Sequence, residues 1–282
     1  MILFTADWHI KLGQKNVPTD WAINRYNMFF EQITELESDC DLHIIGGDLF
    51  DRVPSMDELT LYFDFIRGVT IPTIIYDGNH EATRKNNTFF TNLKKATSDV
   101  NGLVEVIDTT YVEDDWAILP YADLHRKGSI ESIAGDLHAH ENTQRNIVYP
   151  GSPMTTSFHR NRVKTGALLI EDDWSWTWHE LNLPQLIRKT VSDPDEMVPT
   201  DFDHTIYELE GDVQDLAKIK NSELLDKKVV KREVEATLNL TSEMSMSDEL
   251  VVYLQDILNL DKDKIKAIIG VYNDYSTEVN LG

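Results

Sequence analysis

Four short motifs in the sequence carry side chains that can bind divalent metal ions. They read Asp7-Trp8-His9, Gly46-Gly47-Asp48-Leu49-Phe50-Asp51, Gly78-Asn79-His80-Glu81 and His138-Ala139-His140. Residues two apart in an extended chain point to the same side, so Asp7 and His9 can hold one cation together. Asp48 offers two carboxylate oxygens, which allows it to bridge two ions. A mixed set of Asp, Asn and His ligands suits Mn²⁺, Fe²⁺ or Zn²⁺.

Each motif is a weak signal by itself, because a lone histidine is more often a surface or core residue than a ligand. A lone aspartate after a strand is more often a turn residue or a helix cap. Three of the motifs, however, directly follow apolar runs that we expect to form buried strands, at Ile2–Thr5, Leu42–Ile45 and Ile71–Tyr76. Ligands bind at the carboxyl ends of strands in α/β folds. We therefore expect the motifs to form one site.

The elements around the motifs alternate between short apolar runs and helix-like segments, which predicts a layered α/β fold. Apolar residues recur at helical spacing from Trp21 to Leu36, and Thr19 or Asp20 can cap this helix. A capping-box pattern at Ser55 and Glu58 opens a second helix. Further strands are expected at Trp116–Leu119, Ile147–Tyr149 and Ala167–Ile170. An aromatic stripe on another expected strand consists of Trp174, Trp176 and Trp178.

The composition is that of an ordinary globular protein, with 41% apolar and 27% charged residues among 282. Cys40 is the only cysteine, which fits a reducing cytosol. We find neither a signal peptide nor a stretch that approaches the length of a membrane span, so a cytoplasmic protein is expected. The net charge of −23 lacks the basic footprint of many DNA-binding proteins. If the substrate is DNA, metal ions and a partner must supply much of the attraction.

A proline-containing acidic segment, Leu183–Val198, predicts a domain boundary near residue 185. The first domain would then cover residues 1–185, and a smaller mixed α+β region would cover residues 186–282. Strands are expected there at Thr205–Glu210 and Val229–Leu240. Apolar residues near Leu250–Leu258 and Ile265–Tyr272 predict a pair of amphipathic helices at the C-terminus.

The ordered motifs D-x-H, G-G-D-L-F-D, G-N-H-E and H-x-H resemble those of the calcineurin-like metallophosphoesterases. Gly46–Asp51, together with Tyr149–Pro153 and Ser157-Phe158, is similar to the SbcD-type nuclease branch, whose bacteriophage versions are of similar size. The resemblance covers roughly residues 1–185. It implies a two-sheet sandwich flanked by helices.

Residue by residue, the resemblance implies two neighbouring metal sites. Asp7, His9 and His140 would hold one ion, Asn79 and His138 the other, and Asp48 would bridge them. His80 would be the catalytic acid. Two cations about 3.5–4 Å apart stabilise the entering and leaving oxygens of an in-line displacement.

The same resemblance implies a Mn²⁺-dependent DNA exonuclease and endonuclease of recombination, repair and replication, with Mg²⁺, Fe²⁺ or Zn²⁺ as alternative ions. It further implies a homodimer that docks its C-terminal helices on the coiled coil of an SbcC-type ATPase, with no membrane partner. A bacteriophage-encoded protein of this kind would work in the host cytoplasm.

One departure from the family pattern is important. The family carries a further metal-binding histidine before the H-x-H motif, on a segment for which this chain has only residues 122–134. We expect a short helix there and interpret His125 as a residue on its surface, with a substitute metal ligand as the alternative. Leu137 also stands where the family usually has glycine. The shortening leaves open a weakly active or inactive scaffold subunit. A phosphodiesterase for small substrates is a separate alternative.

Two further features stay open at this level. The basic cluster of His159, Arg160, Arg162 and Lys164 is either a phosphate contact or an ordinary solvated loop. Asp51 is either a helix cap or a residue that orients a metal ligand.

Overall fold

The computed structural model describes residues 1–78, 80, 88–107, 109–113, 115–119, 123–129, 131–230, 245–258 and 260–279. The chain forms two compact units, Met1–Val229 and Val230–Gly282. Residues 186–229 thus belong to the first unit, and the expected boundary near residue 185 stays a prediction.

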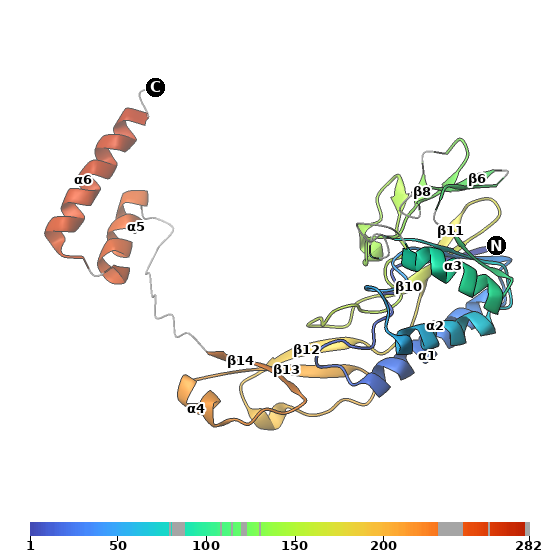
Figure 1. Cartoon of the computed structure of the whole chain (residues 1–282). Coiled ribbons are helices and arrows are strands. Elements are labelled where there is room, and N and C mark those ends of the chain that lie inside the picture. The colour runs from blue at the N-terminus through green and yellow to red at the C-terminus, as the bar shows by residue number, and fades with distance from the viewer. Residues whose placement is uncertain are drawn as a thin grey trace. The chain divides into compact units, whose positions relative to one another are not determined.

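The centre of the first unit is a six-stranded sheet with the order β11-β10-β1-β2-β3-β4 (Figure 1). Its strands are β1 (Ile2–Thr5), β2 (Leu42–Gly46), β3 (Thr73–Tyr76), β4 (Val104–Ile107), β10 (Gly166–Ile170) and β11 (Trp176–Glu180). Strands β1 to β4 run parallel, with Thr5 opposite Ile45 and Gly46 opposite Tyr76. This register aligns the carboxyl ends of β1, β2 and β3, from which three of the four motifs emerge.

The two faces of this sheet pack against different layers, because side chains alternate along each strand. One face meets α1 (Thr19–Glu37), α2 (Met56–Gly68) and α3 (Thr88–Val100) in a core that contains Leu3 and Ile45. The other face meets a second sheet. This arrangement is the predicted sandwich of two sheets flanked by helices.

The second sheet has the order β5-β6-β7-β8-β9. Its strands are β5 (Tyr111–Val112), β6 (Trp116–Leu119), β7 (Asp123–Arg126), β8 (Ser132–Ile133) and β9 (Ile147–Val148). The expectation of a short helix between residues 122 and 134 was wrong, since β7 and β8 pair there as antiparallel strands. His125 lies on β7 with its Nδ1 3.0 Å from Ser132 Oγ, so it is a strand residue and not a helical surface residue.

Local signals at the helix ends were partly correct. The capping box at Ser55 and Glu58 is present at the start of α2 and confirms that prediction. The expected caps of α1 were wrong, because Pro18 is its N-cap and makes no side-chain hydrogen bond.

The predicted aromatic stripe of Trp174, Trp176 and Trp178 was also only partly correct, because Trp174 lies in the turn before β11 with a φ of 70°.

The rest of the first unit is a three-stranded sheet of β12 (Leu186–Val191), β13 (His204–Gly211) and β14 (Leu225–Val230), with helix α4 (Val213–Lys218). Short 3₁₀ helices lie at His140–Asn142 and Pro194–Glu196. Strand β13 confirms the strand expected at Thr205–Glu210. Most of the strand expected at Val229–Leu240 lies outside the described residues.

The second unit contains α5 (Met246–Val252), a π-helical turn at Tyr253–Ile257 and α6 (Lys262–Val279), which confirms the predicted helix pair. Among the described residues, no helix combines the length and the apolar character that a membrane crossing requires.

Candidate metal centre

The segment after β1 places Asp7 and His9 on one side of the chain. Beyond the strand end, this segment still forms backbone hydrogen bonds with the segment after β2. His9 N donates to Asp48 O at 2.9 Å, and Asp7 N donates to Gly47 O at 3.1 Å. Asp7, His9 and Asp48 have φ values of 55°, 44° and 48°, in a region that side-chain-bearing residues rarely adopt. Such strain persists where the surrounding structure enforces it, and it is frequent at functional sites.

The buried side chain of Trp8 holds the positive-φ conformation of Asp7 and His9 in place. It is buried on the opposite side of the chain, with ring centroids 4.8 Å from Phe29 and 5.1 Å from Phe65. Its indole N–H donates to Thr5 Oγ1 at 2.9 Å, and that hydroxyl lies 2.9 Å from Nε2 of buried His43. The apolar residue between Asp7 and His9 thus fixes the direction in which both of them point.

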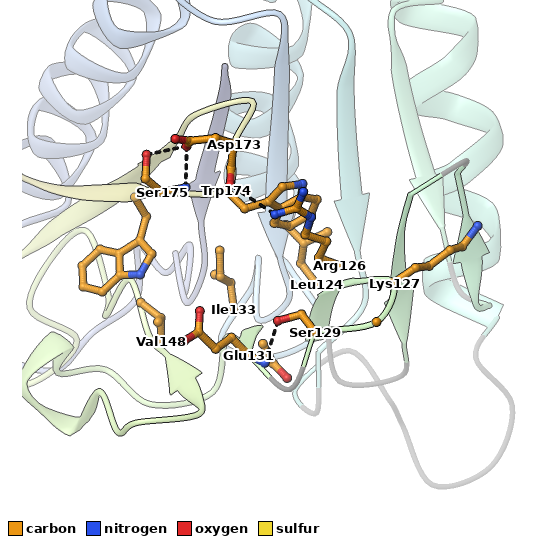
Figure 2. Close-up of a pocket in the computed structure, with 13 residues that line it drawn as sticks. Leu124, Arg126, Lys127, Ser129, Glu131, Ile133, Val148, Asp173, Trp174 and Ser175 are labelled. Atoms are coloured by element: carbon orange, nitrogen blue, oxygen red, sulfur yellow. Dashed lines mark hydrogen bonds between the residues drawn. The ribbon is translucent and has the colours of Figure 1, made fainter.

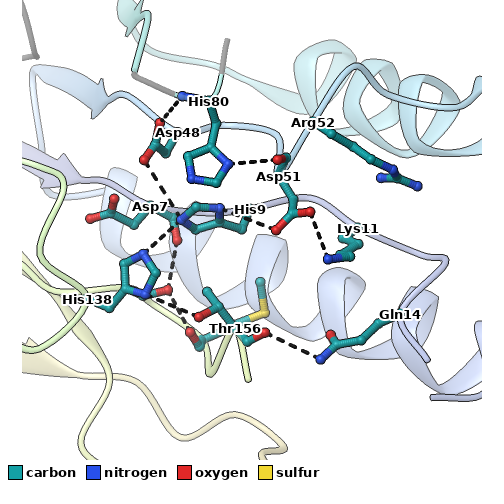
Figure 3. A network of polar contacts seen from close by, with 12 residues as sticks. Asp7, His9, Lys11, Gln14, Asp48, Asp51, Arg52, His80, His138 and Thr156 are labelled. Carbon is teal, nitrogen blue, oxygen red and sulfur yellow. Dashed lines mark hydrogen bonds and ion pairs between the residues drawn. The ribbon is translucent and has the colours of Figure 1, made fainter. Parts of the chain in front are cut away.

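The structure brings five of the predicted site residues together (Figure 3). Asp7, His9 and His138 each offer a ligand atom within 4.8 Å of the others, and so do His9, Asp48 and His80. His9 is common to both groups. Two ligands about 2.1 Å from one metal ion and at right angles are about 3 Å apart, and Nε2 of His9 lies 2.9 Å from Nε2 of His138.

These residues fit a divalent transition metal. Nδ1 of His9 is buried and makes no hydrogen bond to any residue that the structure describes. Nδ1 of His138 lies 3.2 Å from Thr156 Oγ1, which directs its Nε2 toward His9. Carboxylate oxygens and neutral imidazoles are the donor set expected for Mn²⁺, Fe²⁺ or Zn²⁺.

Burial sets the protonation states of the cluster. The pKa of His9 is lowered to about 3, mainly by burial, and the neighbouring His138 and His80 contribute to this shift. Burial also lowers the pKa of His138, although the charge of Asp48 opposes this. The pKa of Asp48 is raised by burial, with the backbone N–H of His80 acting against it. A bound cation would stabilise the charged carboxylate and the neutral imidazoles together.

Close approach of two backbones explains the glycine before Asn79. A Cβ on Gly78 would lie 2.1 Å from Asp48 Oδ1 and 2.2 Å from Asp48 N, so only glycine lets the chain pass. The N–H of His80 then donates to Asp48 Oδ1 at 3.0 Å. Its ring Nδ1 donates to the carbonyl oxygen of Asp51 at 2.7 Å. Because a carbonyl oxygen only accepts, Nδ1 carries the proton and Nε2 is the ring atom that titrates.

Asp51 lies between the cluster and a lysine. Lys11 Nζ is 2.8 Å from Asp51 Oδ2, and His9 Nδ1 is 4.0 Å from Asp51 Oδ1. Burial alone would raise the pKa of Asp51, but the hydrogen bond and charge of Lys11 bring it below its usual value. The helix-cap alternative was wrong, because Ser55 caps α2.

His140 and Asn79 stay predictions as metal ligands. The ring of His140 stacks on Trp178 with a centroid distance of 4.9 Å, and its Nδ1 lies 2.6 Å from Tyr149 O. His140 belongs to neither ligand group found among the described residues, and His138 is the histidine beside Asp7 and His9. Asn79 itself lies outside the described residues.

Sequence reasoning missed Thr156 and Asp136. Thr156 orients His138 as described above, and the N–H of Asp136 donates to Asp7 Oδ1 at 3.1 Å. A signal for Asp136 was available, because Asp136-Leu137-His138 repeats the D-x-H spacing of Asp7-Trp8-His9.

A groove of about 460 Å³ begins at His138 and is lined by His159, Arg162 and Lys164 from the basic cluster. Arg162 pairs with Asp203, and Arg160 pairs with Glu208 at 2.8 Å. Two of the four basic residues therefore serve the local structure in addition to any ligand.

A separate pocket of about 410 Å³ lies between the β7–β8 hairpin and the turn before β11 (Figure 2). Arg126 and Trp174 line it, with the guanidinium 5.9 Å from the indole centroid. None of the predicted site residues is among the described residues that surround it.

Comparison with known proteins identifies the family. The profile of the calcineurin-like phosphoesterase family matches residues 1–192. The chain belongs to the calcineurin-like phosphoesterases. As a member of this family it is a metal-dependent phosphoesterase, and the fold described above is the one predicted for it.

This phosphoesterase is similar to the "Probable exonuclease subunit 1" of Escherichia phage T5. The two are 36% identical over 324 aligned positions, which cover 99% of each chain. Because this chain has 282 residues, at least 42 of those positions are gaps in it. A crystal structure of Pseudomonas putida nuclease MPE is 21% identical with a TM-score of 0.32, and the match covers 49% of this chain and 62% of that one.

Proposed function

We propose that this phosphoesterase hydrolyses DNA phosphodiester bonds with two divalent metal ions, as the nuclease subunit of an SbcCD-type complex. The observation that carries the proposal is the convergence of Asp7, His9, Asp48, His80 and His138 at the carboxyl edge of the main sheet. Similarity to a phage exonuclease subunit along nearly the whole chain supports a nucleic-acid substrate. Exonuclease and endonuclease activities in recombination, repair and replication are the proposed roles.

The side chains divide the work between metal binding and proton transfer. Asp7, His9, Asp48 and His138 would hold the ions, and Asn79 would be a further ligand. When bound, a pair of divalent ions supplies Lewis acidity and positive charge for an in-line displacement at phosphorus. Mn²⁺ is the proposed ion, and the mixed oxygen and nitrogen donors suit it.

His80 is the proposed general acid for the leaving oxygen. Its backbone is held by Asp48 and its Nδ1 by the carbonyl of Asp51, so the ring has a fixed orientation. Nε2 is then the atom that binds and releases the proton. An imidazole suits this role because its ordinary pKa of about 6.5 lies near the working pH.

The groove beside His138 is the proposed path of the substrate strand. It begins at the ligand cluster and carries Lys164, for which the described part of the chain contains no ion pair. With a net charge of −23, the protein must attract a polyanion mainly through its metal ions and its partner.

The second unit is the proposed docking element for an SbcC-type coiled-coil ATPase. Helix docking in a groove uses an exposed apolar face, and Met246, Leu258 and Val271 of this unit are exposed. A homodimer, a boundary near residue 185 and action in the host cytoplasm complete the proposal.

The decisive test is a nuclease assay of the full chain on linear double-stranded and single-stranded DNA, with Mn²⁺ or EDTA, and with and without the ATPase. We expect Mn²⁺-dependent cleavage, and its loss in His80→Ala with Mn²⁺ binding largely retained. The exposed helical variant Asp99→Asn is the matched control and should cleave like the wild type. Unchanged cleavage by His80→Ala would refute the acid role.

The shortened middle of the chain favours a second candidate, a scaffold subunit with little activity. The gaps of at least 42 positions relative to the phage protein support a missing segment. Two equivalents of Mn²⁺ per chain support the enzyme, whereas one or none supports the scaffold. Hydrolysis of a small chromogenic phosphodiester without any DNA cleavage would instead indicate a small-substrate phosphodiesterase.

A further inference from the structure

The segment before His138 contains an acidic residue that the ligand assignment does not yet use. We propose that Asp136 is a carboxylate ligand of the metal centre, standing beside His138 as Asp7 stands beside His9, and that it takes the place assigned above to His140. The inference rests on the proposed two-metal function, because it completes the same centre.

Backbone conformation is the first argument. Six residues other than glycine have a positive φ within the described part of the chain, and they are Asp7, His9, Asn16, Asp48, Asp136 and Trp174. Three of these six are proposed metal ligands. Asp136 shares their conformation, with a φ of 80°. An energetically costly backbone at a ligand is a recognised sign of a side chain held for function.

Position is the second argument. The N–H of Asp136 donates to Asp7 Oδ1 at 3.1 Å, which puts the residue in contact with the first ligand. Gly135 is wedged against the end of β2, since a Cβ there would lie 2.2 Å from the carbonyl oxygen of Gly46. The same Cβ would lie 3.1 Å from the Cβ of Ala6, at the end of β1. Asp136 therefore emerges where Asp7 and Asp48 leave their strands.

Rigid attachment is the third argument. Ala134 N donates to Val148 O, and Ser152 N donates to His138 O, each at 2.9 Å. These two bonds fix the segment on both sides of Asp136. The side chain of Asp136 is exposed, and because it lies outside both ligand groups found among the described residues, its carboxylate would have to turn toward a bound ion.

The place of His140 points the same way. Its ring is stacked on Trp178 and its Nδ1 lies against Tyr149 O, so it forms part of the wall behind His138. The motifs D-x-H and H-x-H share His138. In the first, the second ligand is Asp136, two residues before His138. In the second, it is His140, two residues after His138.

The test is a Mn²⁺ titration of the full, EDTA-treated chain, followed by the electron paramagnetic resonance signal of free Mn²⁺. Asp136→Asn keeps the shape and tolerates a positive φ, and Asp136→Gly removes the side chain without backbone strain. We expect both to weaken one Mn²⁺ site by roughly 10- to 100-fold. Asp136→His should restore tight binding and shift the preference toward Zn²⁺.

Two matched variants complete the design. Asp99→Asn removes an exposed carboxylate from α3 and should bind Mn²⁺ like the wild type, and His140→Asn should keep both sites within a few-fold. Wild-type binding by Asp136→Asn and Asp136→Gly, or the loss of a site in His140→Asn, would overturn the inference. Thermal unfolding of each variant establishes that it is folded.

DNA cleavage by the same preparations separates this inference from the proposed function. A wild type that cleaves DNA, with Mn²⁺ binding indifferent to Asp136, refutes the ligand but keeps the nuclease. A wild type whose Mn²⁺ binding depends on Asp136 but which cleaves no DNA keeps the ligand and refutes the nuclease.

Discussion

The two halves of the proposed metal centre are built in different ways. One half, with Asp7, His9 and Asp48, follows buried parallel strands whose register continues through backbone hydrogen bonds beyond the strand ends. The other half, with Asp136 and His138, lies on an irregular segment between the two-residue strands β8 and β9. In a buried parallel strand, the spacing of residues fixes the directions of their side chains, because the side chains alternate between the two faces and both faces are packed. On an irregular segment the spacing does not fix the side-chain directions. The sequence therefore does not decide whether the second ligand lies two residues before or two residues after His138.

The largest expected effect tests that choice directly. His138→Ala removes the nitrogen that lies 2.9 Å from His9 Nε2, and we expect metal-dependent DNA cleavage to fall by roughly 10³-fold. His140→Ala removes a ring that packs on Trp178, and cleavage should fall by less than about tenfold. Initial rates at saturating Mn²⁺ measure both. Losses of similar size in the two variants would restore the assignment expected from the sequence, in which both histidines bind metal.

A smaller effect is expected where the two halves meet. Gly135→Ala would place a Cβ 2.2 Å from the carbonyl oxygen of Gly46 and 3.1 Å from the Cβ of Ala6. We expect the free energy of unfolding to fall by up to about 3 kcal/mol, as for overpacked cores. Gly102→Ala is the matched control, because its Cβ would meet nothing within 4 Å. Equal denaturant midpoints for the two variants would mean that the halves are not in tight contact.

Particular residues explain how far the sequence could predict this centre. Asp7, His9, Asp48 and His80 were identified because each follows an apolar strand whose end the parallel register defines. Asp136 was missed although Asp136-Leu137-His138 repeats the D-x-H spacing. Its position depends on a left-handed turn and on the close contact at Gly135, which leave no periodic pattern. The hairpin at residues 123–133 was taken for a helix because two short strands offer too few residues to show alternation.

The smallest expected effect concerns the first half alone and depends on pH. Burial keeps His9 neutral in the metal-free protein down to a pKa of about 3, while the unfolded chain takes up a proton near 6.5. Between these values the unfolded state binds more protons, so stability is complete above pH 6.5 and declines as the pH falls. The slope from this one residue is at most about 1.4 kcal/mol per pH unit.

The measurement is the free energy of unfolding of the EDTA-treated chain between pH 7.5 and pH 4.5. His9→Asn tolerates the positive φ of this position and should show a shallower decline than the wild type. His138, His80, Asp48, Asp51 and Lys11 also face His9, and they are common to both proteins. Identical pH profiles would show that the burial of His9 does not control acid stability.

The positive φ values of Asp7, His9, Asp48 and Asp136 also limit what mutagenesis can measure and which substitutions evolution can sample. An alanine at any of these positions loses a donor atom and, in addition, places a Cβ in an unfavourable backbone conformation. Its effect therefore combines two costs, and the donor's contribution would be overstated. Glycine or asparagine is the proper reference at these four sites. Because these positions have a positive φ, evolutionary substitutions there should mostly exchange Asp, Asn, His and Gly for one another.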